Sequence, residues 1–347
     1  MKPFLFVACL LFLSCKSTNI KNADDKPGNE RNNFNPDFTI AFGSCNKTNL
    51  PNILWDDILK DRPDVWIWGG DNVYADTDDA NELKDFYSKQ LAVSGYQKLL
   101  KKVKVLGTWD DHDYGINDGG VDFHFKKTSQ ELFLDFLNVP KDDKRRKREG
   151  IYHSEEFALK NGTVKVLILD TRYFRTSLTD ATDGKKRYQP NRYGEGTILG
   201  KEQWNWLTSE LKASTANFNI IVTSIQLLSN KHGYETWGNF PHEVDRFINL
   251  LAKSKAKGVI VLSGDRHISD FSKTSVTNVS YPLIDFTSSG LTHSSSNNKG
   301  EDNPYRIGTM VNELSYGILR FDLKNNRVLM QMKGDGGQVQ QSLKQEY

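Results

Sequence analysis

Acidic and histidine side chains crowd together where one apolar run of the sequence ends. The run from Val103 leads directly into Asp110, Asp111 and His112, with a further aspartate behind them. Like charges this close together are unfavourable unless a cation compensates them. Carboxylate oxygens are also the ligands that hard metal ions prefer. The cluster therefore indicates a metal site in preference to a solvated loop.

Other apolar runs end in the same way. The side chains at or just beyond their ends are Cys45, Asp71 (with Tyr74 three residues later), Gln226, and Asp265 (with His267 two residues later). Asp265 and His267 point the same way if the strand geometry continues, which suits two ligands on one ion. Each has a simpler alternative. Asp71 can cap a turn, Gln226 can serve only as a hydrogen-bonding residue, and a single histidine can be satisfied in the core.

Cys45 is the one thiol expected in the folded part of the chain. Of the three cysteines, Cys9 lies in the N-terminal apolar run and Cys15 directly after it. Outside the cytoplasm thiols are usually paired in disulfides. A lone thiol is either inert or kept for chemistry, for example as a metal ligand. Its place at the end of an apolar run favours the ligand.

Arg172 follows another apolar run, in the sequence LDTR. Its planar guanidinium suits two oxygens of a phosphate, but a salt bridge to Asp170 or to a neighbour explains it equally well. The acidic side chains of Asp76, Asp78 and Glu82 are interpreted mainly as a solvated helix start, with calcium binding as a weaker alternative.

Together these residues predict a hydrolytic metal centre. Carboxylates, imidazoles and one thiolate favour a mixed set of ions, with a transition metal at the softer end. Two close metal ions beside an arginine suit hydrolysis of a phosphate ester, because they make hydroxide available and stabilise the phosphoryl oxygens. A histidine that is not needed as a ligand can protonate the leaving oxygen. We assign that role to His112.

The elements that must position these residues follow an α/β pattern. Near-continuous apolar runs predict buried strands, at residues 38–45, 64–71, 103–111, 164–172, 219–226 and 258–267, with helices at 52–60, 80–102, 129–138, 200–213 and 241–255. Shorter strands are predicted at 281–289, 315–323 and 327–334. The order indicates an α/β core with a mixed or second sheet. Ligands of such sheets bind beyond the carboxyl ends of the strands, which brings the polar residues to one edge.

The composition of the chain indicates which classes of protein it can belong to. The 347 residues are 37% hydrophobic and 26% charged, as in globular proteins, and the net charge of +2 argues against a nucleic-acid binder.

Residues 1–14 resemble a lipoprotein-type signal that is too short to span a membrane, with Cys15 as the lipidated residue. Residues 15–36 are predicted to be a disordered tether, and residues 37–347 the folded domain. We expect an exported monomer anchored to the membrane only through this lipid, at the periplasmic face or cell surface. Ordinary cleavage to a secreted product is the alternative.

Five short motifs in order resemble the PhoD family of bacterial alkaline phosphatases, within the calcineurin-like and purple-acid-phosphatase group. They are Gly43-Ser44-Cys45, Gly70-Asp71-Asn72-Val73-Tyr74, Trp109-Asp110-Asp111-His112-Asp113, Asp170-Thr171-Arg172 and Gly264-Asp265-Arg266-His267. The lipoprotein-type signal departs from the twin-arginine signal of well-known members. The resemblance covers the chain from Phe38 to His267.

The resemblance implies a four-layer αββα sandwich that holds ferric iron and calcium, with other divalent transition metals left open. The metal ligands that it implies are Cys45, Asp71 (as a bridge), Tyr74, Asp111, Asp265 and His267, with Asp110 and Gln226 as weaker candidates. His112 would be catalytic, and Arg172 would contact the substrate phosphate. The function implied is hydrolysis of organic phosphate esters. A phosphodiesterase or phospholipase C-like enzyme, and a non-catalytic metal- or phosphate-binding lipoprotein, remain alternatives.

Overall fold

The computed structural model describes residues 34–298 and 300–347. Within these ranges, residues 35–347 form one compact unit. The predicted signal sequence, Cys15 and most of the predicted tether lie outside the described residues. Every helix in the described ranges falls short of the length and apolarity that crossing a membrane requires.

The first sheet has six strands in the order β15-β14-β13-β1-β2-β3. Their bounds are β1 Phe38–Gly43, β2 Val65–Gly69, β3 Lys104–Thr108, β13 Tyr316–Asp322, β14 Arg327–Lys333 and β15 Val339–Glu346. Strands β1, β2 and β3 are parallel, and β13, β14 and β15 add antiparallel partners at the other side of β1. The carboxyl ends of three predicted strands therefore meet at one edge.

The second sheet has seven strands in the order β12-β10-β11-β9-β8-β5-β4. Their bounds are β4 His153–Leu159, β5 Gly162–Ile168, β8 Phe218–Val222, β9 Val259–Ser263, β10 Ser269–Thr274, β11 Leu283–Ser288 and β12 Arg306–Val311. Strands β5, β8, β9 and β11 are parallel. A separate two-stranded ribbon joins β6 (Thr179–Asp180) to β7 (Tyr188–Gln189).

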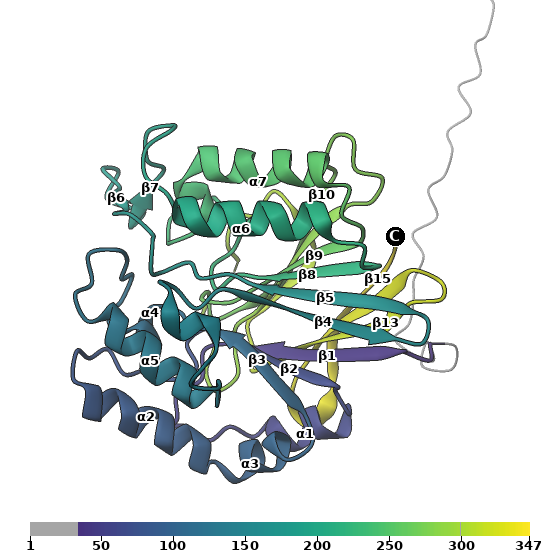
Figure 1. The fold of residues 1–347 in the computed structure, drawn as a ribbon, viewed down its shortest axis with the longest axis horizontal. Coiled ribbons are helices and arrows are strands. Elements are labelled where there is room, and N and C mark those ends of the chain that lie inside the picture. Colours follow the sequence, from purple (N-terminus) through teal and green to yellow (C-terminus); the bar gives the residue numbers. More distant parts are fainter. Residues whose placement is uncertain (1–33, 299) are drawn as a thin grey trace, which may run out of the picture. The chain divides into compact units, whose positions relative to one another are not determined.

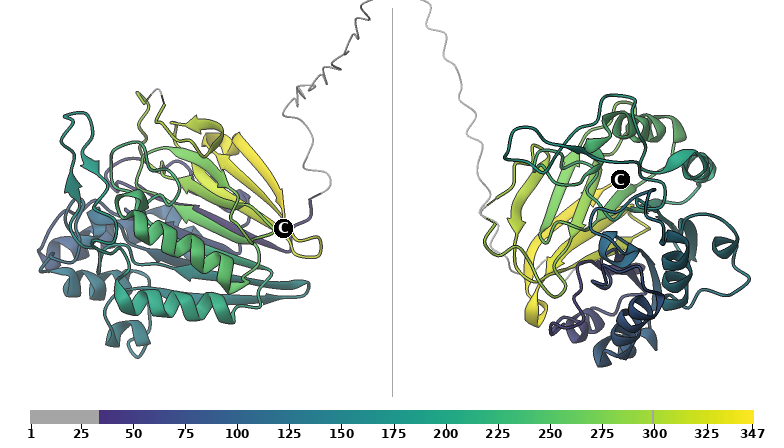
Figure 2. Two further views of the ribbon diagram at one scale, coloured as in Figure 1. Left: turned by 90° about the horizontal axis from the view of Figure 1, so that it is seen from above. Right: turned by 90° about the vertical axis from the view of Figure 1, so that its left-hand side faces the viewer.

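Helices cover the outer faces of both sheets, as Figure 1 shows. On the side of the first sheet lie α1 Trp55–Lys60, α2 Ala80–Ala92, α3 Ser94–Leu100 and α5 Lys126–Phe136, and on the side of the second sheet lie α6 Gly200–Ala213 and α7 Pro241–Ser254. The short helices are α4 Asp111–Tyr114, η2 Lys144–Lys147, η3 Trp237–Asn239 and η4 Asp335–Gly337. Figure 2 gives the same layers from two further directions. The four-layer αββα sandwich is confirmed.

Alternation along the strands explains how each sheet is buried on both faces. Val65 and Ile67 of β2 pack into the core between the two sheets, whereas Trp66 and Trp68 pack under the helices α1, α3 and α5. Successive side chains of a strand point to opposite faces, so a strand buried on both sides must be apolar at every position. This is why the six runs appear in the sequence without interruption.

The structure changes two parts of the sequence-based picture. The six predicted strands are present, but three belong to each sheet, so the polar residues lie at two facing edges and not at one. The single helix predicted at 80–102 is two helices, because Val93 between them is extended (φ −61°, ψ 117°). Strands β4, β10, β12 and β15 escaped prediction, because none of them is a continuous apolar run.

Candidate metal centre

The candidate metal centre lies where the carboxyl ends of the two sheets face each other. The first sheet contributes residues that follow β1, β2 and β3, namely Cys45, Asp71, Asp110 and Asp111, and the second contributes Asp265 and His267 after β9. Gly264 permits this approach, because a Cβ atom there would lie 2.5 Å from Oγ of Ser44 and 2.8 Å from the carbonyl oxygen of Gly69. The two sheets thus meet through backbone at the point where the polar side chains gather.

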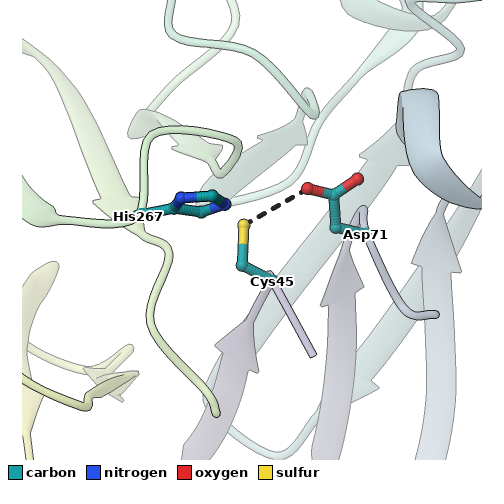
Figure 3. Close-up of side chains that lie close together, drawn as sticks. All are labelled: Cys45, Asp71 and His267. Atoms are coloured by element: carbon teal, nitrogen blue, oxygen red, sulfur yellow. Dashed lines mark hydrogen bonds between the residues drawn. The ribbon is translucent and has the colours of Figure 1, made fainter. Parts of the chain in front are cut away.

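One group of donors combines sulfur, nitrogen and oxygen. The ligand atoms of Cys45, Asp71 and His267 all lie within 4.8 Å of one another, and Figure 3 shows their side chains converging from three loops. Sγ of Cys45 is 3.3 Å from Oδ2 of Asp71. The hydroxyl of Tyr74 lies 3.1 Å from the same Oδ2 and 2.9 Å from Nε2 of His267. This mixture of soft and borderline donors suits a transition metal.

A second group consists of carboxylates. Oxygen atoms of Asp71, Asp110, Asp111 and Asp265 lie within 4.8 Å of one another, and a third set joins Asp71 and Asp111 to His112. Asp71 belongs to all three sets. Two of these oxygens, Oδ1 of Asp71 and Oδ2 of Asp110, are buried without a hydrogen-bond partner among the described residues. A carboxylate shared in this way can bridge two ions, and the oxygen-rich side suits a hard cation.

The electrostatics of the carboxylates fit a cation site. Burial, with the neighbouring Cys45 and Asp111, raises the pKa of Asp71 well above its usual range. Burial likewise raises the pKa of Asp265 to about 8 against the opposing charge of Arg266, and the charges of Asp111 and Cys45 add to the rise. Such carboxylates are costly to ionise together unless positive charge lies among them. The donor set therefore fits bound metal ions.

The backbone at these positions is held in an uncommon conformation. Cys45, Asp71, Asp265 and His267 have φ angles of 61°, 51°, 67° and 53°. Non-glycine residues seldom adopt this left-handed region, at a cost of about 1–3 kcal/mol each. Four strained residues in one cluster lower the stability of the folded state, and in return their side chains are held toward the candidate metal centre. Strain of this kind gathers at functional sites.

His112 lies beside the carboxylates, with one ring nitrogen held by a residue from another loop. Its Nδ1 is 2.7 Å from Oδ1 of Asp76, and its ring stacks on Tyr74 with the centroids 4.2 Å apart. Burial alone would lower the pKa of His112, but the hydrogen bond with Asp76 and the charge of Asp111 raise it to about 9. The contact with Asp76 thus orients the imidazole and favours its protonated form.

Asp76 therefore has a different position from the one predicted. The sequence placed it in a solvated helix start, yet the helix cap is Asp79, which accepts hydrogen bonds from the backbone of Asn81 and Glu82. Asp76 lies in the loop before it, with a φ of 45°. Only its distance of five residues from Asp71 could have drawn attention to it.

Arg172 also differs from the position that the resemblance implied. Its side chain is fully buried and lies between two carboxylates, with Nε 2.5 Å from Oδ1 of Asp110 and Nη1 2.5 Å from Oε2 of Glu235. Arg175 adds a second guanidinium 2.8 Å from Glu235. A guanidinium enclosed in this way has no face open to a substrate. The salt-bridge alternative describes it, with Asp110 and Glu235 as partners. The Asp170 carboxylate instead accepts a hydrogen bond from the backbone nitrogen of Arg172.

Gln226 follows β8 and is buried, with Nε2 donating to Oγ1 of Thr287 over 2.9 Å. Its Oε1 has no hydrogen-bond partner within the described ranges. An amide oxygen left free in this way is able to bind a hard cation. Glu235, in contrast, was missed by sequence reasoning, because it lies in a loop that follows no apolar run.

Comparison with known proteins identifies the family. A profile described as PhoD-like phosphatase matches residues 40–332. This chain belongs to the PhoD-like phosphatase family. Over 123 residues it is 32% identical to alkaline phosphatase D of Bacillus subtilis (strain 168), a match that covers 31% of this chain and 21% of that relative. The chain thus matches about a fifth of its relative's length.

Solved structures share the fold of this PhoD-like chain. A structure described as that of PhoD has a TM-score of 0.68 at 17% identity, covering 88% of this chain and 68% of the other. A dimetal phosphatase from Danio rerio has a TM-score of 0.53 at 14% identity, covering 90% of this chain and all of the other (100%). At these identities the likeness concerns the fold.

Proposed function

We propose that this PhoD-like protein is a metal-dependent phosphoesterase that acts on organic phosphate esters outside the cytoplasm. The observation that carries the proposal is the position of Asp71, which belongs both to the group with Cys45 and His267 and to the group of four carboxylates. A shared carboxylate between two unlike donor sets is the arrangement that holds two ions side by side. Family membership supports the same reaction class.

The residues divide into two sets of ligands. Cys45, Tyr74 and His267 would hold the transition metal, for which the resemblance implies ferric iron. Asp111 and Asp265, with Asp110 and Gln226 as further candidates, would hold a harder ion such as calcium, and Asp71 would bridge. Bound metal ions supply a hydroxide nucleophile near neutral pH and stabilise the phosphoryl oxygens.

The remaining residues handle protons and position. His112 would donate its proton to the leaving alcohol oxygen, and Asp76 would hold the imidazole in place for this step. Arg172 would act as a positioning residue, since one side of its guanidinium holds the Asp110 carboxylate while the other pairs with Glu235. This replaces the substrate contact that the resemblance implied.

The N-terminal assignments belong to this proposal. A signal at residues 1–14 with a lipid on Cys15 would tether the enzyme to the outer face of a membrane, where organic phosphates are met before uptake. Metabolic labelling with a radioactive fatty acid tests this directly. Label on the wild-type chain and none on Cys15→Ser is expected, and equal labelling of the two contradicts the anchor.

The test of the reaction uses protein expressed from Ser17 onward with p-nitrophenyl phosphate and bis-p-nitrophenyl phosphate. We expect turnover of at least one ester, its loss after dialysis against a chelator, and its return on addition of metal. Turnover that survives complete metal removal would overturn the metal-dependent mechanism. Metal binding without turnover of any ester tried would favour the non-catalytic binding protein.

A further inference from the structure

A lysine lies beside the candidate metal centre on the loop that carries the thiol. Lys47 follows Cys45 by two residues, and its Nζ is 4.7 Å from the centroid of the Tyr74 ring. The Lys47 backbone nitrogen donates to Oγ1 of Thr292 over 2.8 Å, and that hydroxyl donates to the carbonyl oxygen of Cys45 over 3.3 Å. The segment is therefore tied down from the second sheet, and the ammonium group is held over an aromatic face.

The other cations around the centre are already engaged. Arg172 and Arg175 are buried against Glu235, Arg266 pairs with Glu301, and Arg187 pairs with Asp118 at 2.7 Å. Lys47 differs from all of them, because across residues 34–298 and 300–347 no carboxylate oxygen lies within ion-pair distance of its Nζ. Its charge is available for a ligand.

The Tyr74 ring links Lys47 to the candidate metal centre. The ring that it covers is stacked against His112 and meets His293 edge-on, with centroids 5.1 Å apart. Tyr74 in turn contacts both Asp71 and His267. The ammonium group thus contacts an aromatic side chain that also touches the proton donor and two of the proposed ligands.

We propose that Lys47 binds the substrate phosphate and selects monoesters over diesters, an inference that rests on the proposed function. A phosphomonoester carries close to two negative charges near neutral pH, because its second pKa is about 6. A diester carries one, and its second organic group occupies the position of the additional charged oxygen. A lysine without a carboxylate partner therefore favours the monoester, and the phosphate contact that the resemblance implied for Arg172 falls to Lys47 instead.

Inorganic phosphate and the two p-nitrophenyl esters test this proposal. Lys47→Met keeps the aliphatic stem over Tyr74 and removes the charge, whereas Lys47→Arg retains the charge. Lys89→Met is the matched control, since its Nζ also lies over an aromatic ring, that of Phe86 at 5.2 Å, on the exposed helix α2. For each variant, kcat/KM for the two esters, the Kd of inorganic phosphate, the metal content and Tm would be measured.

We expect Lys47→Met to lose about ten- to hundredfold in kcat/KM for the monoester and to bind phosphate correspondingly less tightly, as for loss of a charged hydrogen bond. The diester rate should change far less, with metal content intact. Lys47→Arg should keep the monoester preference, and Lys89→Met should match wild type. Equal losses on both esters, or unchanged phosphate affinity, would overturn the role of Lys47. Wild-type protein without chelator-sensitive turnover of either ester would instead overturn the proposed function, and this inference with it.

Discussion

Nδ1 of His112 lies 2.7 Å from Oδ1 of Asp76, a residue 36 positions earlier in the chain. The contact ties the loop after β2 to the short helix after β3, and the backbone nitrogens of Ala75 and Asp76 also donate to the carbonyl oxygen of His112, at 3.2 Å each. The imidazole is consequently fixed by side chain and backbone together. This gives His112 the orientation that a general acid requires.

His112→Ala should lower kcat by about a hundredfold or more while leaving metal content unchanged. Asp76→Asn should also slow turnover, because it removes the charge that orients the imidazole. Since Asp76 acts through His112, the double variant should be no slower than His112→Ala alone.

Asp78→Asn is the matched control for this pair. Asp78 forms a similar contact, 3.2 Å from Nε2 of His124, but on the exposed surface. The Asp78→Asn variant should therefore leave kcat unchanged. Loss of metal from His112→Ala would show that the histidine is a ligand, and additive losses in the double variant would show that Asp76 acts independently of it.

Arg172→Met should destabilise the protein by about 3–5 kcal/mol, because it leaves the carboxylates of Asp110 and Glu235 buried without their partner. Urea unfolding of the metal-loaded protein measures this. Arg192→Met, which breaks the exposed pair with Glu195, is the control and should cost no more than about 1 kcal/mol. An Arg172→Met protein of normal stability with a greatly raised KM would restore the substrate contact that the resemblance implied.

Cys45→Ser should lose the transition metal and keep the harder ion, because a hydroxyl is a poor substitute for a thiolate at the softer group. Elemental analysis of the two metals in the same sample separates the effects. Ser254→Ala, which removes a buried hydroxyl bonded to the carbonyl oxygen of Leu251 on α7, should leave both metals in place. If Cys45→Ser holds the same metals as wild type, the thiol is inert.

The sequence allowed prediction of the strands and most ligand candidates, because both follow from local pattern. A strand buried on both faces is a continuous apolar run, and the residue at its end is visible beside it, as Asp71 is after β2. The structure brings Cys45, Asp71, Asp110, Asp111, Asp265 and His267 together at the ends of their strands, although at two facing sheet edges and not at the single edge predicted.

What could not be predicted depends on contacts between distant segments. Nothing near Arg172 in the sequence shows that Glu235, 63 residues away, will enclose its guanidinium. Asp76 and Lys47 lie in loops whose course is set by tertiary contacts, such as the hydrogen bond from the Lys47 backbone to Thr292. Strand β15 pairs with β14 at the edge of its sheet, and its sequence VQQSLKQE is too polar to carry a strand signal.

The central claim is that Asp71 holds two metal ions together, and the metal stoichiometry of wild type and Asp71→Asn tests it most directly. Both proteins would be expressed from Ser17 onward, loaded with iron and calcium, desalted and analysed for every metal, with circular dichroism to confirm folding. We predict at least two ions per wild-type chain and marked loss of both from the folded variant. A folded Asp71→Asn protein that retains the full wild-type complement, or a wild-type protein that binds no metal, would contradict the account.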